Sequence, residues 1–209
     1  YLPFFPVWLA AQGLSAAEIS TAMACAMLAR VVVGPAAGIV ADALGDRRAV
    51  AIVCALMAAL GFGLMALLGP DYGMAAILPL MLFAVPLNSA TGPIVEAVTA
   101  RGALDYRFDY ARVRMWGSIS FIAANAAAGW AVGLAGPDSV AWIVAGLLIA
   151  CALAYVPMPR LLSDHRAVRR SWRRALARTA SEARVLLRQP VFLIFLATVT
   201  AAQTAHAVM

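Results

Sequence analysis

The chain has 209 residues, of which 64% are hydrophobic and 12% are charged. A soluble domain typically carries about 25% charged residues, so this chain has roughly half the charge that a water-facing surface uses. The composition therefore excludes an ordinary soluble domain and predicts an all-α membrane protein. The net charge of +6 comes from sixteen basic residues, all of them arginine. Abundant alanine and the lack of lysine indicate a high-GC bacterial genome, so we expect the bacterial cytoplasmic (inner) membrane as the location.

Three cysteines fall inside apolar runs, at Cys25, Cys54 and Cys151. They show no pairing pattern and no metal-ligand spacing, so we expect no disulfide framework, no metal site and no cofactor. Residues 1–12 have no basic n-region or cleavage signature, so they predict the end of a truncated first spanning helix and not a signal peptide. Because the chain also stops inside an apolar stretch, we expect a fragment of a longer protein.

A helix that crosses the roughly 30 Å hydrocarbon core needs about 20 apolar residues, at about 1.5 Å per residue. Five runs meet this requirement, at 18–41, 48–69, 74–100, 112–135 and 139–158. Two partial spans flank them, at 1–12 and 190–209. We therefore predict an amino-terminal bundle of six helices over residues 1–159, a basic cytoplasmic connector over 160–189 and the start of a seventh helix over 190–209.

The connectors between these runs alternate in charge. Those at 12–18, 69–73 and 136–139 contain no arginine. The others, together with the ends of the runs beside them, hold every arginine except Arg30. Arg47 and Arg48 lie at one, Arg101, Arg107, Arg112 and Arg114 at the next, and nine arginines between Arg160 and Arg188. The positive-inside rule places the arginine-bearing connectors in the cytoplasm and the others outside.

The basic connector at 160–189 raises the question of nucleic-acid binding. Such binding needs arginines on a soluble domain together with aromatic residues that stack on bases, and Trp172 is the only aromatic residue in this stretch. A surface helix against anionic lipid headgroups fits the same arginines. We therefore expect the lipid bilayer, and not nucleic acid, as its partner.

Prolines concentrate in the first span, at Pro3 and Pro6, and in the fourth, at Pro79, Pro86 and Pro93. These spans correspond to each other if the six helices form two inverted triplets. Interrupted helices at matching positions of two repeats point to the central cavity of a transporter. The alternative is that membrane helices simply tolerate proline.

The second and third spans are joined by Gly38-Ile-Val-Ala-Asp42-Ala-Leu-Gly45-Asp46-Arg47-Arg48, which resembles the signature loop of the major facilitator superfamily. The matching positions are Gly38, Asp42, Gly45 and Arg47. Ala43 and Asp46 replace usual basic positions, so we expect a weaker charge relay. Gly38 would allow two helices to approach closely, Gly45 a tight turn, and Asp42 a bond to main-chain amides or an arginine. An ordinary cytoplasmic turn is the alternative.

Glu96 and Arg114 lie inside the fourth and fifth spans, equally far from position 105 in the loop between them. They should therefore lie at the same depth, about 10 Å from the cytoplasmic helix ends. A carboxylate inside the membrane is costly unless it is paired or faces water, and an opposite charge at matched depth meets that need. The pair binds substrate on one interpretation and only holds the helical hairpin together on the other.

The Gly92–Ala97 and Arg112–Ser118 segments, which contain these charges, are similar to the lactose permease family, in which the corresponding Glu and Arg bind substrate. Other segments are similar to the phenylpropionate permease family: Leu2-Pro3-Phe4, Trp8-Leu9, Gly13-Leu14, Leu104-Asp105-Tyr106, Val113–Ser118, Gln203 and His206-Ala207. The resemblance implies a twelve-helix fold in which this chain is the first bundle, with the carboxy-terminal half missing. It also implies proton-coupled symport of a small organic solute. An aromatic carboxylate is the first candidate, and a sugar or nucleoside the second.

Further polar residues extend the candidate substrate site. Ser118, Phe121 and Asn125 follow Arg114 on one helical face, and Asn88, Ser89 and Gly92 precede Glu96 at comparable offsets. We therefore expect Ser118 and Asn125 to line a substrate cavity, although Ser and Asn can also bond one helix to another.

Two further candidates have an open role. Arg30 lies mid-span and would hold an anionic substrate group or pair with a carboxylate elsewhere in the protein. His206 shares a helical face with Gln203; it would couple protons, as Glu96 would, or serve as a neutral hydrogen-bonding group.

Two classes of protein compete with a transporter. A membrane enzyme would need paired intramembrane carboxylates or metal ligands, and Glu96 stands alone among the spans, so we do not expect an enzyme. A receptor or scaffold would keep the fold and lose solute binding. The chain also lacks the lysine that an ATP-binding loop requires.

Overall fold

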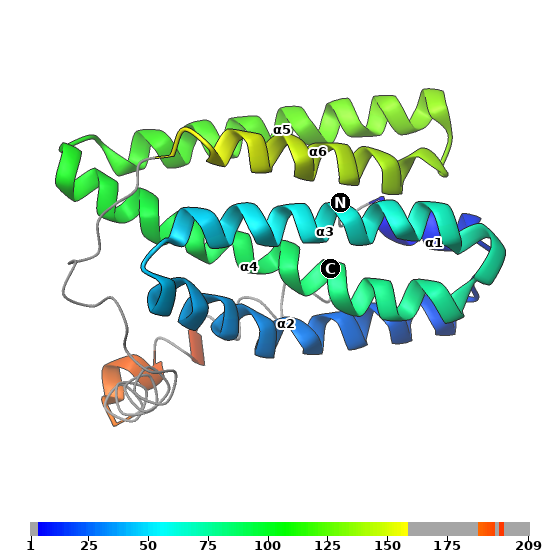
Figure 1. Ribbon diagram of the computed structural model, residues 1–209, viewed down its shortest axis with the longest axis horizontal. Helices are drawn as coiled ribbons and strands as arrows, with labels where there is room; N and C mark the ends of the chain where they lie inside the picture. Colours follow the sequence, from blue (N-terminus) through cyan, green and yellow to red (C-terminus); the bar gives the residue numbers. More distant parts are fainter. Residues whose placement is uncertain (1–3, 159–187, 195–196, 199–209) are drawn as a thin grey trace. The chain divides into compact units, whose positions relative to one another are not determined.

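The computed structural model describes residues 4–158, 188–194 and 197–198, and every regular element in these ranges is helical (Figure 1). The chain divides into two units, residues 1–165 and 166–209. The first unit contains α1 (Phe5–Ala11), α2 (Ala16–Leu44), α3 (Arg47–Tyr72), α4 (Met74–Tyr106), α5 (Tyr110–Ala135) and α6 (Ser139–Tyr155). In the second unit, residues 190–194 and 197–198 are helical.

The predicted spans correspond one to one with these helices. Of the described helices, α2, α3, α4 and α5 are long and apolar enough to cross a membrane. The run predicted at 139–158 forms a shorter helix than expected, since α6 has 17 residues and ends at Tyr155. Seventeen residues lie at the lower end of the roughly 17–25 that a spanning helix uses. The chain is therefore a multi-pass membrane protein.

Polar residues at the helix ends set where the helices begin and stop. Ser15 and Glu18 form a capping box at the start of α2, and Gly45 ends this helix in the left-handed conformation with φ 68°. The carboxylates of Asp46 and Asp109 accept main-chain N–H bonds of 2.9 Å at the starts of α3 and α5. These bonds satisfy donors that a helix start leaves without a partner.

Helix α3 is central to the packing of the first unit. It lies against α4 on one side and α6 on the other, and α2 packs on α4 (Figure 1). By contrast, α5 contacts α4 and α6 only sparsely, and none of its residues is buried within the described part of the chain. The polar residues of α5 therefore lie on an open face.

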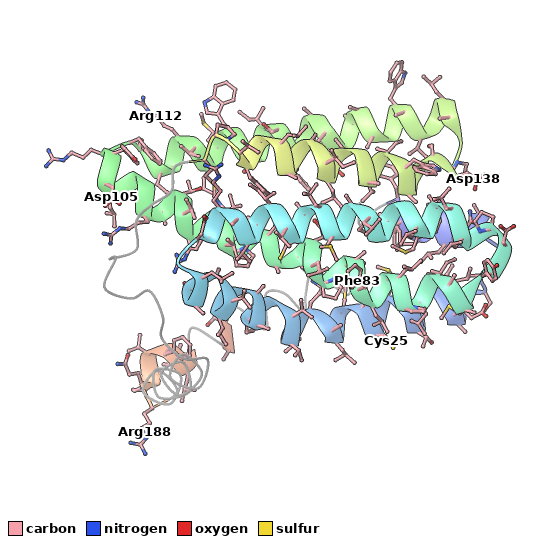
Figure 2. All side chains as sticks on the ribbon, in the orientation of Figure 1. Cys25, Phe83, Asp105, Arg112, Asp138 and Arg188 are labelled. Carbon is pink, nitrogen blue, oxygen red and sulfur yellow. The ribbon has the colours of Figure 1, made fainter. Side chains whose placement is uncertain are left out.

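Two long-range hydrogen bonds agree with the predicted alternation of the connectors. Gln12 Nε2 donates to Asp138 Oδ1 at 3.0 Å, which joins two of the arginine-free connectors. Arg48 donates to the Met158 carbonyl oxygen at 3.4 Å, which joins an arginine-bearing connector to the end of α6. Asp105 and Asp138 lie at opposite ends of the helices (Figure 2).

The buried residues form two separate core clusters. The first core cluster consists of Phe5, Trp8, Leu9, Leu14, Ala22, Ala26, Ala58, Ala59, Phe62, Met65, Ile77, Met81, Ala84, Val85, Val140, Ala141, Val144, Ala145 and Leu148. The second core cluster consists of Ala37, Ala41, Val50, Ala51, Cys54, Ala90 and Ile94. In the first, the Phe5 ring stacks on Trp8 and meets Phe62 edge-on, both at 5.5 Å between ring centroids.

A glycine sets the close approach of α3 to α4. A Cβ added at Gly61 would lie 2.7 Å from the Ala84 Cβ and 3.4 Å from its Cα. Because the Ala84 methyl group is fixed to the main chain, neither side can give way without moving a helix. Gly63, two residues later on α3, has open space at the same position.

Of the two interpretations of the prolines in the fourth span, the structure agrees with the one in which the helix tolerates them. Helix α4 runs without a break from Met74 to Tyr106 with Pro79, Pro86 and Pro93 inside it. Each proline removes one main-chain donor, and the adjacent turns continue the helix. In α1, Pro6 lies in the first helical turn, where its missing N–H has no helical partner to lose.

Candidate substrate site on α4 and α5

An ion pair joins α4 to α5 at one end of the bundle. Arg114 Nη1 lies 2.7 Å from Glu96 Oε2, and the two residues come from neighbouring helices linked by the short connector 107–109. Arg107 makes this connector tight, because it takes the left-handed conformation with φ 53° at the end of α4. The predicted pairing of the two charges is therefore confirmed.

Tyr110 is a third member of this site and was missed by the sequence analysis. Its hydroxyl donates to Glu96 Oε1, so each carboxylate oxygen accepts a bond from α5. Tyr110 and Arg114 are four residues apart, so they share one face of the helix. That spacing was visible in the sequence, but the tyrosine has no charge to draw attention to it. We refer to Glu96, Tyr110 and Arg114 as the α4–α5 cluster.

The α4–α5 cluster is open. The Arg114 side chain is 65% exposed and that of Glu96 is 45% exposed among the described residues. Each charge supplies the partner that the other needs inside the membrane, so the pair can hold the hairpin together. Because the pair is open on one side within the described residues, its groups are also accessible to a ligand.

The neighbouring charges stay close to the helix ends. Arg101 pairs with Asp105 at 3.2 Å and Arg112 pairs with Asp109 at 3.5 Å, each within one helical turn. Figure 2 shows Asp105 and Arg112 at the α4–α5 end of the bundle. Both pairs are exposed, so they supply matched controls for substitutions in the cluster.

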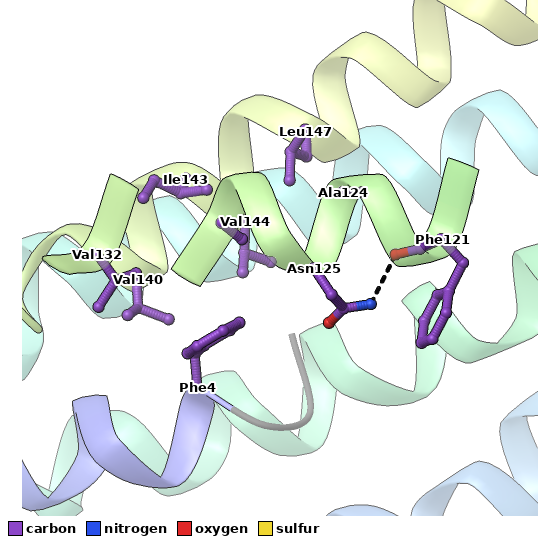
Figure 3. A pocket seen from close by; sticks show the side chains of 10 residues that line it. Phe4, Phe121, Ala124, Asn125, Val132, Val140, Ile143, Val144 and Leu147 are labelled. Carbon is purple, nitrogen blue, oxygen red and sulfur yellow. Dashed lines mark hydrogen bonds between the residues drawn. The ribbon is translucent and has the colours of Figure 1, made fainter. Parts of the chain in front are cut away.

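Ser118 and Asn125 do not join α5 to another described helix. The Ser118 hydroxyl donates to the Arg114 carbonyl oxygen at 3.3 Å, and Asn125 Nδ2 donates to the Phe121 carbonyl oxygen at 2.8 Å (Figure 3). Neither side chain has a bond to Glu96 within the described part of the chain. Their predicted role in substrate binding stays a prediction.

Asn125 lines a small cavity between α5 and α6. The cavity has a volume of about 140 Å³. Its other lining residues are apolar: Phe4, Phe121, Ala124, Ala128, Val132, Val140, Ile143, Val144 and Leu147 (Figure 3). The carboxamide is thus the single polar side chain among the residues that line this space.

Arg30 is half-buried in the middle of α2. It forms no ion pair or hydrogen bond with another described residue. The structure therefore does not bring it to Glu96. His206 and Gln203 lie outside the described residues, as does the basic connector apart from Arg188 and Gln189.

The α2–α3 loop agrees with most of the physical expectations for it. Asp42 Oδ1 accepts bonds from Arg47 at 2.8 and 3.1 Å, and Gly45 makes the left-handed turn. Asp46, which replaces a usual basic residue, instead caps α3. The close approach expected at Gly38 is wrong for the described helices, since a Cβ there would meet nothing within 4 Å. A role of the loop in conformational change stays a prediction.

Metal binding finds no support in the described residues, where no three His, Cys, Asp or Glu side chains could hold an ion together. Cys25, Cys54 and Cys151 carry free thiols. The chemistry that the α4–α5 cluster offers is recognition by hydrogen bonds and charge.

Comparison with known proteins agrees with this architecture. The model of the MFS_1 like family matches residues 1–209. The lactose permease of Klebsiella oxytoca is 29% identical over 166 residues, which are 76% of this chain and 39% of the permease. No solved structure matches. The closer likeness to the phenylpropionate permeases stays a prediction. The chain belongs to the MFS_1 like family.

Proposed function

We propose that the chain forms the amino-terminal bundle of a proton-coupled symporter in the bacterial cytoplasmic membrane. The solute is a small organic molecule, with an aromatic carboxylate as the first candidate and a sugar or nucleoside as the second. The observation that carries this proposal is the engagement of both Glu96 oxygens by donors from α5. A lactose permease among the relatives supports solute transport as the general activity.

The α4–α5 cluster is suited to exchanging its internal bonds for bonds to a solute. Glu96 accepts one bond from Tyr110 and one from Arg114. A solute with hydroxyl groups replaces these donors at Glu96, which frees Tyr110 and Arg114 to donate to acceptors on the solute. Both charged side chains are partly exposed among the described residues, so a solute can reach them.

Glu96 also gives the proposed site a way to carry a proton. Protonation removes the negative charge that holds Arg114 and turns one carboxyl oxygen into a donor. The Arg114 guanidinium is then free for an acceptor on the solute. Proton binding and solute binding are thereby linked through one carboxyl group, which is the requirement for symport.

The chain spans 39% of the length of the lactose permease that it matches. We propose that residues 1–159 are one bundle, 160–189 the cytoplasmic connector and 190–209 the start of helix seven. A second bundle in the carboxy-terminal half would then supply the opposite wall of the site. The open face of α5, which has no buried residue, is consistent with such a wall.

Uptake by the whole transporter in proteoliposomes tests the proposal. Radiolabelled 3-phenylpropionate, lactose and uridine would be offered with an imposed inward proton gradient. We expect one of them to accumulate above its external concentration and to be released when a protonophore is added. Accumulation that ignores the proton gradient would contradict symport. Absence of uptake for every solute tried, with specific binding retained, would favour the receptor or scaffold alternative.

A further inference from the structure

Arg30 lies at the exact middle of α2 by residue count, fourteen residues from Ala16 and fourteen from Leu44. The buried residues of this helix are Ala22, Ala26, Ala37 and Ala41. Arg30 follows Ala26 by four residues and precedes Ala37 by seven, so it lies on the same face. This face packs against α4. The arginine therefore belongs to a helix interface and not to the outer surface of α2.

The two core clusters are separated at this level. Ala22 and Ala26 belong to the first core cluster, and Ala37 and Ala41 belong to the second. On α4, Leu87 packs against both clusters, which places it at the boundary between them. Arg30 occupies the matching place on α2. An apolar interface of small alanines is thus interrupted at mid-membrane by a guanidinium.

No acidic residue in the described part of the chain is placed to neutralise Arg30. Of the eight acidic residues in the described part, seven lie in connectors or within three residues of a helix end. The eighth is Glu96, and both of its oxygens are already bonded to α5. The remaining two, Asp164 and Glu182, belong to the hydrophilic stretch 160–189. A charged arginine at the centre of a bilayer costs at least about 2.5–3.5 kcal/mol without a partner or water.

The guanidinium of Arg30 supplies a planar fork of N–H donors. This fork matches the two oxygens of a carboxylate, which accepts bidentate bonds from arginine. Arg30 is half-buried and forms no ion pair or hydrogen bond with another described residue, so its donors are available to such a group.

We infer that the boundary between the two core clusters is a carboxylate-binding site, with Arg30 as its charge and its donor. Glu96 lies nine residues after Leu87 on α4, so this level is about 14 Å from the α4–α5 cluster along the helix axis. The site is therefore distinct from that cluster. That the bound carboxylate belongs to the transported solute rests on the proposed function; that a carboxylate binds does not.

The carboxylate could come from a solute or from another segment of the protein. The direction in which Arg30→Gln changes the Tm distinguishes these two sources. Arg30→Gln would be measured in the purified, ligand-free whole protein by thermal unfolding. If the site awaits a solute, the substitution removes an uncompensated charge, so Tm stays the same or rises. If a protein carboxylate pairs with Arg30, the substitution strands that carboxylate and Tm falls. A fall in Tm would overturn the assignment to a solute.

Binding is then measured with acids and their neutral amides. Benzoate and 3-phenylpropionate, with benzamide and 3-phenylpropionamide as uncharged counterparts, would be titrated while the rise in Tm is followed. We expect Arg30→Gln to raise the half-saturating concentration of the acids at least tenfold and to leave that of the amides unchanged. Arg30→Lys, which keeps the charge and loses the fork, should retain part of the acid binding.

The matched control is Arg112→Gln, which removes the same charge from an exposed arginine at the end of α5. It should leave the half-saturating concentrations of the acids unchanged. Equal acid binding by Arg30→Gln and the unaltered protein, or no stabilisation of the unaltered protein by any acid, would overturn the site. Acid binding that depends on Arg30 without any uptake would instead contradict symport and leave the site standing.

Discussion

Glu96 and Arg114 meet at 2.7 Å across the α4–α5 hairpin although eighteen residues separate them in the chain. The distance follows from the antiparallel arrangement of two helices around a short connector. The pair is open on one side within the described bundle, so a solute can reach it. Its structural and substrate-binding roles are separable by experiment, because loss of the first lowers expression and stability and loss of the second lowers binding alone.

Glu96→Gln and Arg114→Ala should each impair solute binding severely and leave expression and Tm close to those of the unaltered protein. A lost charged hydrogen bond to the solute is worth about 1.5–3 kcal/mol, or about tenfold to a hundredfold in affinity. Uptake and membrane expression would be measured side by side. Arg112→Ala, which breaks only the exposed pair with Asp109, is the control and should transport normally.

The exchanged pair, Glu96→Arg with Arg114→Glu, separates the two roles further. A pair that only joins the helices works in either direction, so exchange would restore both expression and uptake. A pair that contacts different parts of a solute should remain inactive after exchange, at normal expression. Near-normal uptake by either single variant would place the solute site elsewhere in the protein.

Tyr110→Phe should weaken solute binding less than the loss of either charge. It removes one donor to Glu96 and keeps the ring in place, and a hydrogen bond of this kind is worth about 1 kcal/mol, or about fivefold. Tyr106→Phe is the matched control, because this exposed tyrosine lies in the last turn of α4. Equal effects of the two substitutions on the half-saturating concentration for uptake would show that Tyr110 has no special role.

The helices and the ion pair could be predicted from sequence because each follows from a local rule. Apolar run length gave the spans, and equal spacing from position 105 placed Glu96 opposite Arg114. Tyr110 could not be singled out in the same way, since a tyrosine at a helix end has several common uses. Its bond to Glu96 depends on the left-handed conformation of Arg107, which turns the chain tightly enough to bring the ends of α4 and α5 together.

The effects of the prolines and of Gly38 depend on their surroundings, so the sequence alone could not decide them. The three prolines of the fourth span fitted either an interrupted or a continuous helix, and the intact turns between them keep α4 continuous. Gly38 was expected at a close helix contact, whereas the close contact of α3 and α4 lies at Gly61. A glycine in an apolar run permits two helices to approach closely, but only the packed structure shows at which glycine they do so.

Gly61→Ala and Gly63→Ala should change stability in opposite directions. At Gly61 the new methyl group lies 2.7 Å from the Ala84 Cβ, so the helices must separate, at a cost of about 1–3 kcal/mol. At Gly63 the methyl group meets open space, and replacing glycine by alanine inside a helix gains about 0.5–1 kcal/mol. Thermal unfolding of the two purified variants should show a lower Tm for the first only. A higher Tm for Gly61→Ala would contradict the close packing of α3 on α4.

The orientation in the membrane is tested by single cysteines in a background that lacks Cys25, Cys54 and Cys151. Cysteines at positions 71 and 138 lie in or beside arginine-free connectors and should react with a membrane-impermeant maleimide added to intact cells. Cysteines at 46 and 173 lie in arginine-bearing connectors and should react only after the membrane is opened. The bond between Gln12 and Asp138 joins two connectors predicted to lie outside, so position 12 should label together with position 138. Labelling of a cysteine at position 173 in intact cells would contradict the predicted orientation. A proton would then reach Glu96 from the opposite side of the membrane.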